Sequence, residues 1–162
     1  MLRSSLPSRS TEVHGRTFAW ALLLTCAAAP AQTLNNNTAL SFGAFTAGSG
    51  GTITVAPGGS RMKTGSVILV NQGGTASAAQ FTISGTPSAV FVISLPVDGT
   101  VFLSDGASGN MALNGFTSSP SVTGVLSGGG TQTINVGATL SVGNLQGTGS
   151  YSGSFNVTVN YQ

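Results

Sequence analysis

Short apolar runs separated by glycine- and serine-rich stretches recur along the chain after residue 31. Alternation of apolar and polar positions predicts half-buried strands at 52–55 and 79–85, with Phe81 and Ile83 on one face. The continuous apolar run at 66–70 predicts a strand that is buried on both sides. Similar runs predict further strands at 39–45, 90–95, 100–103, 111–117, 131–136 and 138–142. No stretch shows the spacing of an amphipathic helix.

The longest uninterrupted alternation lies at the end of the chain, from Tyr151 to Tyr161. Serine, asparagine and threonine occupy one face of this segment. The other face carries Tyr151, Gly153, Phe155, Val157, Val159 and Tyr161. A period of two without a break predicts an eleven-residue strand with one buried face.

Turn signals between these runs indicate an antiparallel arrangement. Asp98-Gly99 separates two β-rich runs, and this dipeptide is typical of a tight hairpin between neighbouring strands. No repeat of fixed period is present, which disfavours a β-helix. Most runs are shorter than the roughly 9–11 residues of a strand that spans a membrane. The pattern predicts an all-β fold, an antiparallel immunoglobulin-like β-sandwich of about eight to ten short strands.

The first 31 residues have the composition of an export signal. A polar stretch with three arginines precedes the apolar run 18–29, and Ala29-Pro30-Ala31 supplies the small residues of a cleavage site. We therefore expect a signal peptide at 1–31, a short N-terminal segment at 32–38 and the sandwich at 39–162. The expected location is the periplasm, the cell surface or the extracellular space. Cys26 is either a small residue within the apolar run or the lipidated cysteine of a lipoprotein signal.

Charge is almost absent after residue 31. The only charged side chains there are Arg61, Lys63, Asp98 and Asp105, and this part of the chain has no His, Cys, Glu or Trp. Without His, Cys or Glu, this part of the chain lacks the usual general bases and zinc ligands, so its many hydroxyls lack the base that would normally activate them, and two cations cannot form a track for a phosphate backbone. We expect no enzyme activity, no metal or other cofactor, no nucleic-acid partner and no membrane insertion of the mature chain.

The few polar candidates have simple structural explanations. Asp98 and Asp105 each precede a glycine and are predicted to be turn residues; the alternatives are a carboxylate pair for glycoside hydrolysis or a weak calcium site. Arg61 and Lys63 are predicted to be solubilising charges on a loop. The pairs Thr52/Thr54 and Thr131/Thr133 are either edge-strand residues or parts of a flat threonine face that binds ice.

The end of the chain resembles the C-terminal strand of chaperone–usher pilins. The resemblance rests on the terminal alternation, on Tyr161 next to the last residue and on Gly149 ahead of the strand. It implies an assembly strand that a periplasmic chaperone or a like subunit pairs with. The implied residues are Gly149, Tyr151, Phe155, Val157, Val159 and Tyr161. The alternative is a plain strand of the sandwich.

Most of residues 39–162 is similar to the domain-of-unknown-function family 4402, a group of exported bacterial β-proteins with fimbrial and spore-coat-U-like members. The similar blocks are Leu40–Phe45, Gly50–Pro57, Ala79–Gly85, Thr131–Leu140 and Gly149–Phe155. The resemblance implies an exported surface or pilus-like domain with no established activity. The chain departs from a strand donor at 32–38, where Leu34 is the only large apolar side chain.

Two functions follow as expectations. The first is a structural or adhesive subunit of a surface assembly that associates by β-strand complementation. It is favoured because soluble sheet proteins usually protect their edges with charge or proline, which this chain scarcely does. The second is a self-contained binding module for a glycan or another surface ligand. A domain completed by its own N-terminal strand supports the module, and an empty groove supports the subunit.

Overall fold

The structure is a computed structural model that describes residues 32–71 and 74–162. The predicted signal peptide at 1–31 and the alternative at Cys26 lie outside the described residues. Every regular element in the described ranges is a β-strand, and paired strands run antiparallel. The strands are β1 (Thr33–Thr38), β2 (Phe45–Thr46), β3 (Gly51–Val55), β4 (Arg61–Gly65), β5 (Ile68–Leu69), β6 (Ala79–Ser84), β7 (Val90–Ser94), β8 (Val101–Ser104), β9 (Asn110–Ser119), β10 (Thr123–Val125), β11 (Thr131–Val142) and β12 (Thr158–Tyr161).

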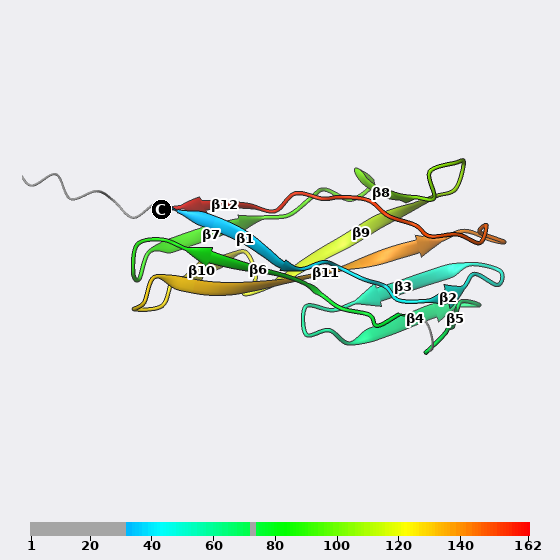
Figure 1. Ribbon diagram of the computed structural model, residues 1–162, viewed down its shortest axis with the longest axis horizontal. Helices are drawn as coiled ribbons and strands as arrows, with labels where there is room; N and C mark the ends of the chain where they lie inside the picture. The colour runs from blue at the N-terminus through cyan, green and yellow to red at the C-terminus, as the bar shows by residue number, and fades with distance from the viewer. Residues whose placement is uncertain (1–31, 72–73) are drawn as a thin grey trace, which may run out of the picture.

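The larger sheet has seven strands and is built around β11, its longest strand. Along one edge β11 pairs first with β6 and then with β3. Along the other edge it pairs with β9, which in turn pairs with β8. β1 lies beyond β6, β4 lies beyond β3 and β8 lies beyond β9, so these three strands end the sheet. Figure 1 shows the resulting elongated molecule.

A second layer covers the larger sheet. It contains the three-stranded sheet β10-β7-β12, the two-stranded pair β2-β5 and the extended chain that leads into β12. Phe91 and Ile93 of β7 are buried in one cluster with Phe81 and Ile83 of β6, so the two sheets pack face to face. The predicted all-β antiparallel sandwich is therefore confirmed.

The core consists of two clusters, one in each half of the long molecule. The first cluster contains Phe42, Ile53, Val55, Val67, Val101, Met111, Leu113, Ala138, Leu140 and Val142. The second contains Ala79, Phe81, Ile83, Phe91, Ile93, Leu126, Ile134 and Val136. Three partly buried side chains, Leu40, Phe116 and Phe155, pack against both clusters. These three residues connect the two halves of the core.

Gly137 lies at the point where β11 passes from β6 to β3. A Cβ atom at this buried position would overlap the carbonyl oxygen of Val55 and crowd the backbone of Ala56. Only glycine allows the strands to approach this closely. The predicted strands at 131–136 and 138–142 are therefore one continuous strand, because Gly137 is a contact point and not a break.

Two predicted strands of the N-terminal half are largely wrong. The run at 39–45 forms only a bridge between Ser41 and Ser77, followed by the first residue of β2. The run at 66–70 contributes the two residues of β5, and Ile68 is 60 % exposed. Val67 is the one fully buried residue of this run, and Leu69 packs against the first core cluster while partly exposed.

The predicted hairpin at Asp98-Gly99 is also wrong, although the turn itself is present. β7 belongs to the smaller sheet and β8 pairs with β9, so the turn connects two layers. Asp98 Oδ1 accepts a hydrogen bond of 2.7 Å from the backbone N–H of Gly115, and the N–H of Gly99 donates to Asn114 Oδ1 at 2.9 Å. These bonds hold the turn against β9 and away from a direct β7–β8 ladder.

We expect Gly137→Ala to destabilise the fold by at least about 2 kcal/mol, since the new methyl group meets backbone atoms that cannot move independently. Urea unfolding followed by circular dichroism measures the change. Gly58→Ala is the matched control, because nothing lies within 4 Å of a Cβ atom there, and its effect should stay within about 0.5 kcal/mol. Equal effects of the two substitutions would contradict the close approach at Gly137.

Candidate functional site

The predicted assembly strand at 151–161, called the C-terminal segment below, has one buried and one exposed face. Tyr151, Phe155, Val157, Val159 and Tyr161 are partly buried, and the serine, asparagine and threonine residues between them are exposed. The predicted alternation is thus confirmed except at Gly153, which is exposed. In Figure 1 the segment is the red part of the chain, and it runs along one side of the molecule past β8 into β12.

The C-terminal segment is a hydrogen-bonded strand only at its ends, so the predicted eleven-residue ladder is too long. Ser152 exchanges backbone hydrogen bonds of 2.8 and 2.9 Å with Ser104 of β8, and Thr158–Tyr161 pairs with β7. Within the described residues, no backbone hydrogen bond joins 153–157 to a neighbouring strand. The gap arises because the segment crosses from β8 to β7, while the chain between them turns toward β9.

Phe155 lies in the middle of this unpaired stretch and connects the two core clusters. Its ring centroid is 5.2 Å from that of Phe116 and 6.3 Å from that of Phe81, the latter in an edge-to-face arrangement. Val157 and Val159 pack against the second cluster. The apolar face therefore holds the segment in place where backbone pairing is absent.

Tyr161 joins the two layers at the end of the chain. Its ring is 6.4 Å from that of Phe91 in the smaller sheet, and its hydroxyl donates to the carbonyl oxygen of Ser84 in β6 at 3.3 Å. Burial raises the pKa of the Tyr161 phenol above its ordinary value of 10.0, because the phenolate loses hydration.

The first two predicted assembly residues belong to the turn that precedes the strand. The Tyr151 hydroxyl donates to the carbonyl oxygen of Gly147 at 2.9 Å and accepts from Gln146 Nε2 at 3.0 Å. Gly149 is exposed, and a Cβ atom there would make an ordinary contact with Asp105. Gly149 therefore lies outside the paired part of the C-terminal segment.

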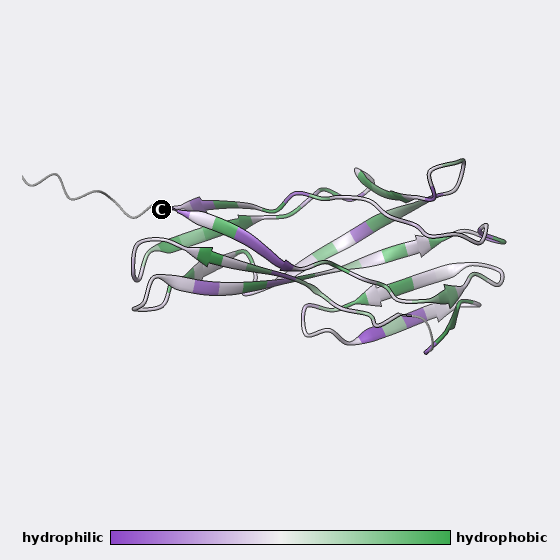
Figure 2. Cartoon of the chain, viewed as in Figure 1, coloured by the Kyte–Doolittle hydropathy of each residue, from purple (hydrophilic) through white to green (hydrophobic). Residues whose placement is uncertain are grey.

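The N-terminal segment, for which the sequence contains no strand signal, forms β1 on the outer edge of β6. All six of its residues are exposed, and Figure 2 shows a single hydrophobic band followed by a hydrophilic stretch. A hollow of about 210 Å³, called the terminal groove below, separates β1 and β6 from the end of the C-terminal segment. It is lined by Gln32, Thr33, Leu34, Ile83, Val159 and Tyr161.

The charged residues lie away from the terminal groove. Arg61 and Lys63 are on β4, at the opposite end of the larger sheet, so their predicted position on a loop is wrong. Arg61 Nη2 donates to the carbonyl oxygen of Ala44 at 2.7 Å, and burial lowers the pKa of the guanidinium. Asp105 is a turn residue as predicted, since its Oδ1 accepts from the backbone N–H groups of Ala107 and Gly109.

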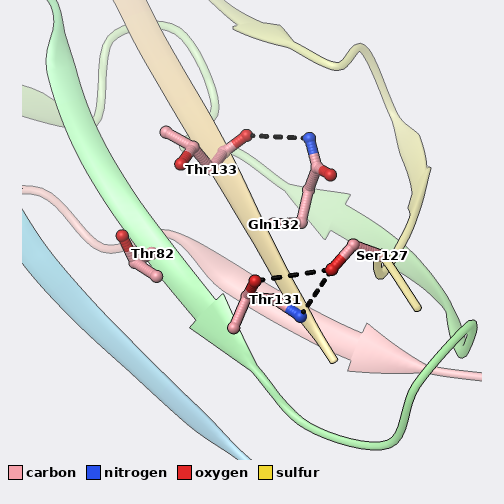
Figure 3. Close-up of a pocket in the computed structure, with 5 residues that line it drawn as sticks. All are labelled: Thr82, Ser127, Thr131, Gln132 and Thr133. Carbon is pink, nitrogen blue, oxygen red and sulfur yellow. Dashed lines mark hydrogen bonds between the residues drawn. The ribbon is translucent and has the colours of Figure 1, made fainter. Parts of the chain in front are cut away.

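A second hollow, of about 320 Å³, lies on the larger sheet and is lined by hydroxyl and amide groups (Figure 3). Ser127 Oγ accepts from the N–H of Thr131 at 3.2 Å, and Gln132 Nε2 donates to the carbonyl oxygen of Thr133 at 3.3 Å. Thr82 forms the opposite wall and accepts from Asn37 Nδ2 at 2.6 Å. Among the described residues, none of those lining this hollow is ionisable, so it offers no base to activate a hydroxyl.

No helix in 32–71 or 74–162 is long and apolar enough to cross a membrane. In the same ranges no three or more His, Cys, Asp or Glu side chains gather as a metal site would require.

Truncation of the ring that connects the two clusters should be costly. We expect Phe155→Ala to lower the free energy of unfolding by about 2–4 kcal/mol, somewhat less than for a fully buried ring. Ser154→Ala, next to it on the exposed face, should change it by less than about 0.5 kcal/mol. Urea unfolding compares the two, and a small effect of Phe155→Ala would show that the segment is not part of the core.

The phenol of Tyr161 predicts an alkaline loss of stability. Because the pKa of Tyr161 is raised in the folded protein, its contribution to the free energy of unfolding is fully present below pH about 10, where the unfolded phenol is still protonated. The contribution is lost as the pH rises through the pKa of Tyr161 in the folded protein. Thermal unfolding from neutral to alkaline pH should show this decrease in the natural protein and a smaller one in Tyr161→Phe. The same alkaline decrease in both proteins would refute the assignment to Tyr161.

Comparison with known proteins gives one result. No curated protein and no solved structure matches the chain. One family of protein domains, described as a domain of unknown function (DUF4402), matches residues 33–161, which includes all twelve strands and the whole C-terminal segment. The chain therefore belongs to the DUF4402 family.

Proposed function

We propose that the protein is a non-enzymatic, exported structural or adhesive subunit of a bacterial surface or pilus-like assembly. It associates by β-strand complementation at the side of the sandwich formed by β1 and the C-terminal segment. The sandwich is of the immunoglobulin-like type in this proposal, which rests on its two packed antiparallel sheets. Its partners are like subunits or a periplasmic chaperone.

One observation carries the proposal, namely the open backbone edge of the C-terminal segment. Residues 153–157 have no backbone partner within the described residues, while Phe155 and Val157 keep the segment extended on the core. Extended chain with free N–H and C=O groups is a template for an added strand. A neighbouring strand would find a hydrogen-bonding edge at 153–157, and the terminal groove lies further along the same segment at Val159 and Tyr161.

The distribution of charge supports the same side of the molecule. β4 carries Arg61 and Lys63 at one end of the larger sheet, as expected for an edge that must not pair. β1, β10 and β12 carry no charged residue. The edges of β1 and β12 thus lack the protection that β4 has and are open to pairing, as is the edge of β10 on the far side of β7.

A self-contained binding module is the second candidate, and β1 is the observation that favours it. β1 pairs with β6 of its own chain through five residue pairs, so the sheet is already extended by its own N-terminal strand. A glycan site usually needs exposed aromatic rings. Among the described residues, Phe102 is the only aromatic side chain in the group of exposed large apolar residues, so we rank the module second.

Envelope extracts of cells that produce the protein test the proposal on SDS gels, with and without boiling. We expect complexes larger than the monomer that collapse on heating, because strand-paired subunits resist detergent until they unfold. Asn156→Lys, which adds a charge to the exposed face of the open segment, should reduce the complexes at least severalfold. Met62→Lys adds the same charge to β4 and should leave them unchanged. A monomer band in every lane would contradict assembly.

A further inference from the structure

β1 fills its place beside β6 poorly, and the pairing register shows why. Leu34 lies opposite Ile83, and Asn36 lies opposite Phe81. Directly opposed residues project from the same face of a sheet, and Ile83 and Phe81 are both buried in the core. Leu34 and Asn36 therefore occupy the two core-facing positions of β1. One of these two positions carries a polar amide.

The other core-facing position is incompletely buried. Leu34 is 38 % exposed and borders the terminal groove, whose opposite wall is Val159 and Tyr161 of the C-terminal segment. Ile83 is fully buried at the base of the groove. The groove therefore has an apolar base and one apolar wall, whereas the strand that lies over it supplies one leucine.

We propose that β1 is a displaceable occupant of this position, and that the partner is a strand from a different protein with apolar side chains at both core-facing positions. This inference rests on the proposed function and names its partner. The incoming strand would pair with β6 in place of β1. One of its apolar side chains would enter the terminal groove in place of Leu34, and the other would lie beside Phe81 in place of Asn36. Among the residues that the structure describes, no charged residue lines the groove, so the strand should be uncharged at these positions.

A second copy of this chain does not meet the requirement. Its own 32–38 segment carries the same Leu34 and Asn36, so an exchange between copies would replace one strand with an identical strand. Such an exchange gains no contact and still carries the entropic cost of association. A strand with two apolar side chains gains burial at the position of Asn36. The geometry thus makes this chain an acceptor of strands and a poor donor.

Fluorescent peptides test the inference with the purified protein, incubated just below its unfolding temperature so that β1 can exchange. One peptide has the natural sequence of residues 32–38, and two others carry the changes N36I and N35I. Asn35 lies opposite Thr82 and faces away from the core, so the N35I peptide is a control of equal hydrophobicity. We expect the N36I peptide to bind at least tenfold more tightly than either of the others.

Matched variants of the protein make the test independent of peptide behaviour. Asn36→Ile in the protein should raise the unfolding temperature and weaken binding of the N36I peptide at least tenfold, because β1 then fills its own place. Asn35→Ile should do neither. Equal binding of the N36I and N35I peptides, or the same effect of both protein variants, would overturn the inference.

Two other outcomes separate the inference from the proposed function. If the natural peptide binds as tightly as the N36I peptide, copies of this chain complement one another; the heterologous partner is then wrong, and the assembly subunit stands. If no peptide binds and Asn36→Ile leaves the unfolding temperature unchanged, β1 does not occupy an exchangeable position. The inference then fails, whereas heat-sensitive complexes in the envelope extracts would still support the proposed function.

Discussion

The sandwich depends on the apolar face of the C-terminal segment. β3, β8, β9 and β11 bury one cluster and β6, β7 and β11 bury another, and the segment that contains Phe155 lies across both. Burial of a large apolar side chain contributes about 1.5–3 kcal/mol, so a few such residues exceed what a short backbone ladder adds. The segment can therefore leave its own hydrogen bonds unmade and remain extended on the core, which creates the open edge on which the proposed assembly relies.

The low net charge of the chain after residue 31 leaves this open edge poorly protected against pairing with other molecules. With four charged side chains after residue 31, the protein has few means to keep strands of other molecules away. Two of the four are turn acceptors, since Asp98 binds Gly115 and Asp105 binds Gly109. The other two lie on β4. The two aspartates thus stabilise turns and the two cations lie on one edge strand, so the side formed by β1 and β12 carries no charged side chain.

The sequence predicted the fold class and the buried faces better than the pairing of strands. Period-two alternation identified the core positions of β6 and of the C-terminal segment, because alternation follows directly from strand geometry. It missed β1, where Asn35, Asn36 and Asn37 give no strand signal and pairing with β6 alone orders the chain. It misread Gly137 as a break and Asp98-Gly99 as a hairpin turn, because both depend on contacts with strands distant in the sequence. The apolar face of the C-terminal segment was recognisable by pattern, whereas the partial ladder and the terminal groove follow only from tertiary packing.

Amide hydrogen exchange in the C-terminal segment tests the central claim most directly. In the dilute protein, the account predicts rapid exchange at Ser154–Val157 beside protected amides in β12, even though Phe155 and Val157 are partly buried. The same amides should become protected when the protein is isolated within its envelope complexes. Protection of Ser154–Val157 already in the dilute protein would mean that the segment is fully paired within its own fold, and this result would contradict an open edge available for assembly.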